Sequence, residues 1–158
     1  MAFQVSPSDL RPVLDCPLAW RWTQPSHAVL TAEELSAMAC LVPEAAREAA
    51  AISLLVHGPA GLLTPPVSGL RTLPVGAPPK EQEVRTWLKR LPTGSEQEVI
   101  ASWDSEIALF LPWSLFVMRW DDFCYPSSDD ITVFPVSQAW VLAYHHYAAF
   151  QWGRWCAA

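Results

Sequence analysis

The chain has 158 residues, which suits one domain of ordinary size and is too short for two. Hydrophobic residues make up 51% and charged residues 16%, which excludes a disordered chain, and the net charge of −6 argues against nucleic-acid binding. No apolar stretch reaches the roughly 20 residues of a membrane helix, and the N-terminus lacks the apolar run of a signal peptide. We therefore expect a cytoplasmic protein that does not associate with membranes.

The N-terminal part of the chain is expected to be mainly helical. The first 25 residues are rich in proline and predict an irregular segment with one short strand at 19–23. The Thr-Ala-Glu-Glu sequence at 31–34 is a capping box and predicts a helix to about residue 41. Pro43 suits the first turn of a second helix, which good helix formers extend to residue 56.

Residues 57–79 form an unusual segment that contains six prolines and four glycines. Such a composition predicts an extended strap, through which no regular helix or strand runs. Its leucines and valines indicate that it packs on the domain and is not a solvated linker. An amphipathic helix follows at 80–91, where the apolar residues recur at helical spacing.

The C-terminal part has the pattern of short strands. A run of apolar residues behind Pro112 predicts a helix that ends at Asp121. We expect an α+β fold in a single domain, residues 1–158, with N-terminal helices packed on a small C-terminal antiparallel sheet. The strands are expected at residues 99–103, 107–111, 130–134, 139–144 and 147–152.

Four cysteines occur at spacings that match no zinc or redox motif. An even number permits two disulfides, but a chain this apolar does not need them, and we expect reduced thiols. Cys124 lies between two aromatic residues, which favours a buried, inert thiol over a nucleophile paired with a histidine.

Charge is distributed unevenly along the chain. Residues 1–90 contain eight acidic and eight basic residues, so the whole net charge of −6 lies in residues 91–158. Four of those acids fall between residues 121 and 130, where there is no basic residue. Such a negative field attracts cationic partners or metal ions, although acidic residues also serve simply to keep a tryptophan-rich surface soluble.

The most distinctive segment runs from Trp120 to Asp130, with the sequence W-D-D-F-C-Y-P-S-S-D-D. Two pairs of aspartates flank a Tyr-Pro-Ser-Ser turn. One interpretation is structural: the aspartates end a helix or cap a turn, and the aromatic residues insert into the core. The other is an exposed acidic loop that its aromatic residues hold rigid, so that it binds a partner at low ordering cost.

The W-D-D-F-x-Y-P-S-S-D-D motif, followed by Tyr144-His-His146 and Phe150-x-x-Gly-Arg154, resembles a bacterial domain family of unknown function. The resemblance covers roughly residues 95–155. In size, acidity and general style the chain also resembles, more loosely, the small immunity proteins of toxin–immunity systems. This resemblance implies a non-catalytic protein that binds a cognate toxin, and it assigns no catalytic residues.

Our first hypothesis is therefore a cytoplasmic immunity protein that needs no cofactor and binds another protein, a basic toxin domain, through an acidic, aromatic surface. The predicted partner-binding residues are Asp121, Asp122, Tyr125, Asp129, Asp130 and Trp152. Trp152 belongs to this set because the tryptophans nearest the C-terminus are expected to be exposed, and an exposed Trp often anchors an interface.

The alternative is a small metal-dependent enzyme whose ligands are Asp121, Asp122 and a histidine, His145 or His146. Adjacent histidines on a strand point to opposite faces and cannot bind one ion together, whereas in a tight turn both are exposed. A third hypothesis is a homo-oligomer in which the proline-rich strap lies across the neighbouring subunit.

Overall fold

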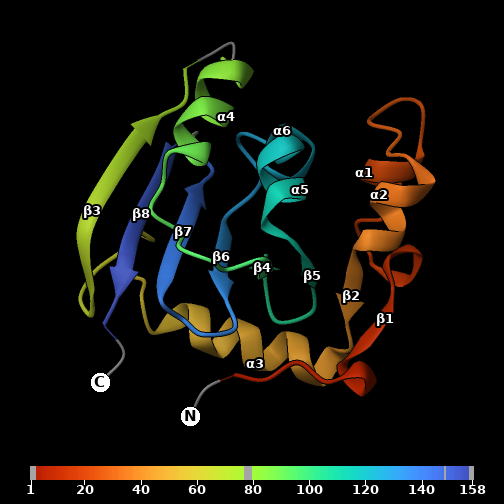
Figure 1. Ribbon diagram of the computed structural model, residues 1–158, viewed down its shortest axis with the longest axis horizontal. Coiled ribbons are helices and arrows are strands. Elements are labelled where there is room, and N and C mark those ends of the chain that lie inside the picture. The colour runs from red at the N-terminus through yellow and green to blue at the C-terminus, as the bar shows by residue number, and fades with distance from the viewer. Residues whose placement is uncertain (1–2, 77–79, 148, 157–158) are drawn as a thin grey trace.

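A computed structural model describes residues 3–76, 80–147 and 149–156. Its centre is an eight-stranded, fully antiparallel sheet with the order β1-β2-β5-β4-β6-β7-β8-β3. In Figure 1, β3 lies at the left edge, β1 and β2 lie at the right edge, and α3 crosses below the strands. The strands are β1 Leu10–Pro12, β2 Ala39–Leu41, β3 Val67–Pro74, β4 Glu98–Ser102, β5 Ala108–Pro112, β6 Ile131–Pro135, β7 Trp140–His145 and β8 Ala149–Trp155.

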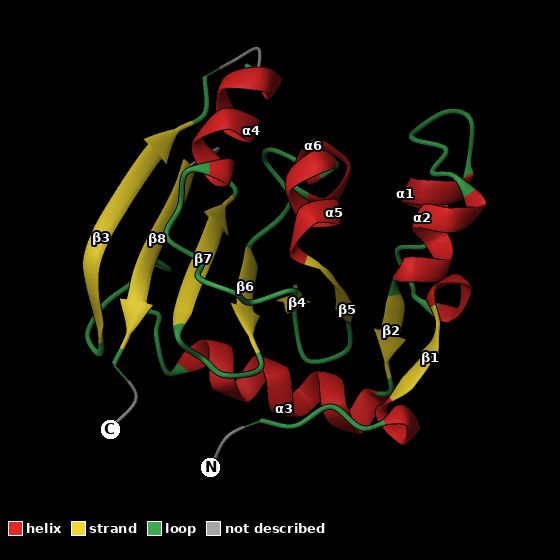
Figure 2. Cartoon of the chain, in the orientation of Figure 1, coloured by secondary structure: helices red, strands yellow, loops and turns green. Residues whose placement is uncertain are grey.

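Helices are short, apart from two (Figure 2). The longest is α3, Pro43–Leu54, and the next is α4, Glu81–Lys89. The other helices are α1 Trp20–Thr23, α2 Ala32–Ala37, α5 Trp113–Met118 and α6 Trp120–Phe123, with 3-10 turns at Pro7–Asp9 and Val13–Asp15.

Both faces of the sheet are covered, because successive side chains of its strands enter two different core clusters. Along β7, Leu142 and Tyr144 belong to the larger cluster, whereas Val141 and Ala143 belong to the smaller one. This two-sided burial explains why the central strands are continuously apolar in sequence and do not alternate with polar residues. The larger cluster also contains side chains of α1, α4, α5 and α6, and the smaller one contains three alanines of α3.

Several local predictions are confirmed. The capping box forms: Thr31 accepts a hydrogen bond from the Glu34 amide, and the Glu34 carboxylate accepts one from the Thr31 amide. Pro43 begins α3, where its missing N–H costs nothing. Helix α4 and strands β4 to β8 lie within one to three residues of the expected positions.

Three local predictions are wrong. The strand expected at 19–23 is instead the short helix α1. The helix expected to reach residue 41 ends at Ala37, and β2 begins two residues later. The single helix expected before Asp121 is broken at Arg119 into α5 and α6. In each case tertiary contacts decide the structure of a segment only a few residues long, for which local propensity is weak.

The proline-rich strap contains a regular strand, contrary to the prediction. Its prolines stand before and at the end of β3, so the residues between them are free to pair with β8. The pairing shifts register between Ser68 and Arg71, where Gly69 has a φ of 63°. Residues 77–79 of the predicted strap lie outside the described residues.

The observed fold is thus α+β with an antiparallel sheet, as expected, but the sheet is not small and is not confined to the C-terminal part. Strands β1, β2 and β3 come from the first half of the chain. Cys16, Cys40, Cys124 and Cys156 are free thiols, of which Cys156 alone is exposed. None of the helices in the described ranges has the length and apolar character needed to cross a membrane.

Candidate functional site

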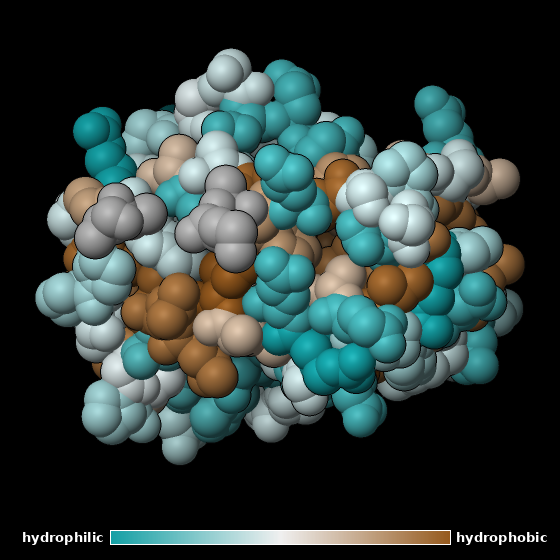
Figure 3. Space-filling view, turned by 90° about the horizontal axis from the view of Figure 1, so that it is seen from below, coloured by the Kyte–Doolittle hydropathy of each residue, from teal (hydrophilic) through white to brown (hydrophobic). Residues whose placement is uncertain are grey.

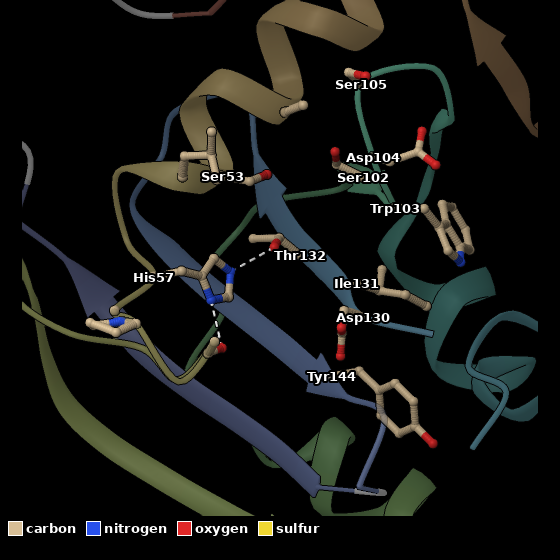
Figure 4. A pocket seen from close by; sticks show the side chains of 15 residues that line it. Ser53, His57, Ser102, Trp103, Asp104, Ser105, Asp130, Ile131, Thr132 and Tyr144 are labelled. Atoms are coloured by element: carbon tan, nitrogen blue, oxygen red, sulfur yellow. Dashed lines mark hydrogen bonds between the residues drawn. The ribbon is translucent and has the colours of Figure 1, made fainter. Parts of the chain in front are cut away.

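A cavity of about 480 Å³ opens between the C-terminal end of α3, the loop after it and the ends of β4 and β6. Figure 4 shows His57 on one side of it and Trp103 and Asp104 on the other, with Thr132 between them. No Lys or Arg is among the described residues that line this cavity. A volume of this size accommodates a small molecule or a long side chain of another protein.

His57 lines the cavity, and both of its ring nitrogens form hydrogen bonds. Nδ1 donates a hydrogen bond to the Gly61 carbonyl oxygen at 2.8 Å, so Nε2 accepts one from the Thr132 hydroxyl, also at 2.8 Å. Burial lowers the pKa of His57, which keeps the ring neutral, and the hydrogen bond to Gly61 opposes this shift only in part. The arrangement is that of a base held beside a hydroxyl, but Thr132 is itself buried.

Three polar residues and one alanine form one row across the sheet beneath this loop. The Cα atoms of Ser102, Thr132, Ala143 and Gln151 pair successively across β4, β6, β7 and β8. Gln151 accepts a hydrogen bond from the Leu63 amide at 2.9 Å. Thr132 and Gln151 therefore attach the loop after α3 to the sheet, which is a structural function for two polar residues in otherwise apolar strands.

Asp130 and the two adjacent histidines meet at one rim of the cavity. His146 donates to Asp130 Oδ1 through its backbone N–H and through Nδ1, both at 2.9 Å. The His145 and His146 ring centroids are 4.2 Å apart. Partial burial acts to raise the pKa of Asp130, but the hydrogen bonds from His146 outweigh it and hold that pKa below its ordinary value.

Asp129 has the opposite environment, although it is the next residue in the chain. It is 5% exposed and forms a two-pronged ion pair with Arg21, and it also accepts the Tyr125 amide hydrogen at 2.9 Å. The Arg21 guanidinium lies over the Tyr125 ring, 4.0 Å from its centroid. The prediction that Asp129 contacts a partner is therefore corrected, because its carboxylate is used inside the protein.

Each aspartate of the first pair lies near an arginine. Asp121 lies 3.8 Å from Arg85 of α4, and Asp122 lies 3.8 Å from Arg119. Both carboxylates are half-buried, and burial together with the charge of Asp121 raises the pKa of Asp122. The two aspartate pairs consequently do not form the single exposed acidic loop that the sequence suggested.

The two aromatic residues of the predicted partner-binding surface, Tyr125 and Trp152, do not lie on one exposed surface. Trp152 is 1% exposed in the larger core cluster, which corrects its prediction as an interface anchor. Trp155 is buried as well. Tyr125 remains half-buried beside Arg21, and Cys124 is buried with its pKa raised by burial, as the inert-thiol interpretation predicted.

The set of residues predicted for the alternative metal site is also corrected. Among the described residues, the group of possible ligands that comes together is Asp130, His145 and His146, whose ligand atoms lie within 4.8 Å of one another. Asp121 and Asp122 are not part of it. Strand β7 ends at His145, and the turn that begins there brings the two imidazoles to one side.

Sequence reasoning missed the contribution of His57, Thr132 and Asp104 to the cavity. They lie far apart in the chain, and only strand pairing and the fold of the loop after α3 bring them together. For Thr132 the available signal was a polar residue at an inward position of an apolar strand, whereas His57 and Asp104 lie in connecting segments. Searches of protein-family models, curated proteins and solved structures found no match for the chain.

Proposed function

We propose that the protein binds another protein that has a basic surface, and that it does so at the cavity and not through the 121–130 segment as a whole. Asp104 and Asp130 are exposed and line the cavity, and Glu106 is exposed in the same turn as Asp104. We call these three residues the acidic rim. The observation that carries the proposal is this concentration of carboxylates around a cavity whose described lining contains no basic residue. A cationic group is the complementary occupant.

Hydrophobic side chains next to the acidic rim supply contact area. Leu54, which lines the cavity, is 74% exposed, and Tyr147, whose ring packs on those of His145 and His146, is 81% exposed. Figure 3 shows hydrophobic side chains gathered on part of the face seen from below, among hydrophilic ones. An exposed Tyr and Leu around a charged centre resemble an interface in which a few apolar anchors provide most of the binding energy.

The acidic rim is held in place before any partner arrives. Asp104 Oδ1 accepts the amide hydrogens of Glu106 and Ile107 at 2.7 and 2.9 Å, which fixes the turn between β4 and β5. Asp130 is fixed by His146. Since little side-chain order must be gained on binding, a Lys or Arg of the partner that enters between these carboxylates meets a preorganised site.

The resemblance to immunity proteins indicates the class of partner. A nuclease or other toxin domain that acts on an anionic substrate carries a basic active site, and an acidic protein neutralises it by covering that site. Such a function needs no catalysis by this chain and no cofactor. A non-catalytic function is consistent with the state of His57, because both of its ring nitrogens are already hydrogen-bonded within the protein.

The test begins with the genes that flank this one: we expect one of them to encode a toxin domain, and that domain is co-expressed with this protein. We expect co-expression to restore growth and the two proteins to form a stable complex. Asp104→Lys combined with Glu106→Lys should weaken that complex about tenfold or more and abolish growth rescue, because the charge at the rim is reversed.

Glu98→Lys is the matched control, because Glu98 is an exposed acid at the opposite end of β4. It should leave both binding and rescue unchanged. Unaltered binding by the Asp104→Lys/Glu106→Lys protein, with unfolding curves that match the unsubstituted chain, would contradict the proposed surface. Absence of any complex with the neighbouring toxin domain would contradict the immunity function.

A further inference from the structure

We propose that Asp130, His145 and His146 bind one divalent transition-metal ion, of which Zn²⁺ is the best match, at the rim of the cavity. The inference does not rest on the proposed protein-binding function. Two imidazoles and one carboxylate are a ligand set that zinc accepts, and three protein ligands leave a coordination position for a further group. The possible ligand atoms already lie within 4.8 Å of one another.

The distances require only a small closure. Ligand atoms at 2.0–2.2 Å from a tetrahedral zinc ion lie about 3.3–3.6 Å apart, so the separation of any pair must change by roughly 1.5 Å at most. The Asp130 side chain is 62% exposed and the His146 side chain is 34% exposed, so an ion that replaces the proton shared by Asp130 Oδ1 and His146 Nδ1 has room to enter. Rotation of the exposed Asp130 side chain and of the half-buried His146 side chain makes most of this adjustment, and no strand has to move.

The backbone around the ligands is held by the fold. Asp130 directly precedes β6 and His145 ends β7, and the neighbouring residues Ile131 and Tyr144 are paired between those strands. The Ser127 amide donates to the His146 carbonyl oxygen at 2.9 Å. A short β-turn thus presents two consecutive imidazoles on the same side, which a continuous strand forbids.

The loop after α3 supports His145 from the cavity side. A Cβ atom at Gly61 would lie 3.3 Å from His145 Cδ2 and 3.5 Å from Nε2, so the glycine backbone lies close against the ring. Gly61 has a φ of 74° and accepts the hydrogen bond from His57. His57 therefore acts as a positioning residue, because it holds the loop that contacts a ligand and does not itself complete the set.

The open position of the ion would face the cavity. Asp130 and Gly61 both line it, so a ligand that entered the cavity would meet the ion from that side. The chemical class expected there is a small oxygen or nitrogen donor, such as a water molecule or a carboxylate. The ion would also neutralise part of the acidic rim, which distinguishes this site from one that attracts a cationic side chain.

The test titrates the purified full chain with Zn²⁺ alone by calorimetry and with Co²⁺ by visible absorption, which reports coordination geometry as well as affinity. We expect one ion per chain with a dissociation constant in the micromolar range or tighter. His145→Gln and His146→Gln should each weaken binding about tenfold or more, and Asp130→Asn should change the Co²⁺ spectrum.

Three control substitutions should leave binding unchanged: His27→Gln, an exposed histidine on another loop; Asp104→Asn, a carboxylate of the same cavity; and Cys156→Ser, an exposed thiol. Absence of saturable binding, or binding that survives the His145→Gln/His146→Gln double substitution, would overturn the site. His146→Gln should not abolish toxin neutralisation, whereas Asp104→Lys with Glu106→Lys should spare the metal, so the two proposals fail separately.

Discussion

The two faces of the sheet differ in what covers them. The larger core cluster contains seven of the nine tryptophans as buried or partly buried members, and helices α1, α4, α5 and α6 contribute to it. The smaller cluster is covered by one helix, α3, through alanine side chains, and the cavity opens beside it. We infer that the larger cluster contributes most of the free energy of folding, whereas the face with the smaller cluster has a cavity in which the proposed ligands have room to bind.

Asp129 and Asp130 show the same contrast within two residues. Asp129 is enclosed with Arg21 next to the larger cluster, and Asp130 is exposed at the cavity rim. A strand begins directly after them, so consecutive side chains turn to different sides. One aspartate therefore serves the fold and the other is available to a ligand.

Substitution of Asp129 should give the largest effect on stability. Asp129→Ala leaves the buried Arg21 charge without its partner and should cost about 3–5 kcal/mol of unfolding free energy in urea denaturation. The same substitution at Asp130 should cost about 1 kcal/mol, because that side chain is exposed. Equal losses at the two positions would remove the distinction between the faces.

Trp152→Ala tests the larger cluster directly. Removal of a side chain that is 1% exposed creates a cavity and should cost about 3–5 kcal/mol, measured in the same way. Trp20→Ala, at a residue 38% exposed, should cost about 1 kcal/mol. A small loss at Trp152 would restore its earlier interpretation as a surface residue.

Gly61→Ala should have a moderate effect on the lightly covered face. Its positive φ costs an alanine about 1 kcal/mol, and contact with His145 adds to that cost. Gly69→Ala is the control, because Gly69 has a similar φ but no atom within 4 Å of the added Cβ. If thermal unfolding shows equal losses, the loop does not press on His145.

The smallest effect expected is a dependence of stability on pH through His57. Its folded pKa lies below the ordinary value of 6.5, so the unfolded chain binds the proton first. Stability should therefore fall as the pH decreases below about 6.5, and Asp130 and His145 modulate the shift through their charges. His57→Gln should flatten this part of the pH profile of the urea midpoint, whereas His27→Gln should preserve it.

The sequence predicted those elements whose signal is local. The capping box at Thr31, the proline at the start of α3 and the apolar runs of β4 to β8 all depend on neighbours a few residues away. The strand β3 was missed because prolines at its two ends outweighed the pairing-competent residues between them. Its partner β8 lies about 80 residues further along the chain.

The candidate site was predicted only in part for the same reason. His145 and His146 were predicted as alternative metal ligands together with Asp121 and Asp122, but the aspartate that lies beside the histidines is Asp130, and strand pairing decides this. The burial of Asp129 depends on Arg21, 108 residues away, and no local pattern reports such a pairing. Long-range contacts thus decide which carboxylates remain free.

The ends of the sheet limit how this protein assembles with others. Strand β1 has three residues and ends in Pro12, and β3 is interrupted by its register shift near Gly69 and ends in Pro74. Neither edge of the described sheet presents a long, regular row of backbone groups, so addition of a ninth strand from another chain is disfavoured. The proposed partner would therefore be recognised through side chains and loops, and we expect sequence changes at the cavity to alter that recognition without altering the architecture.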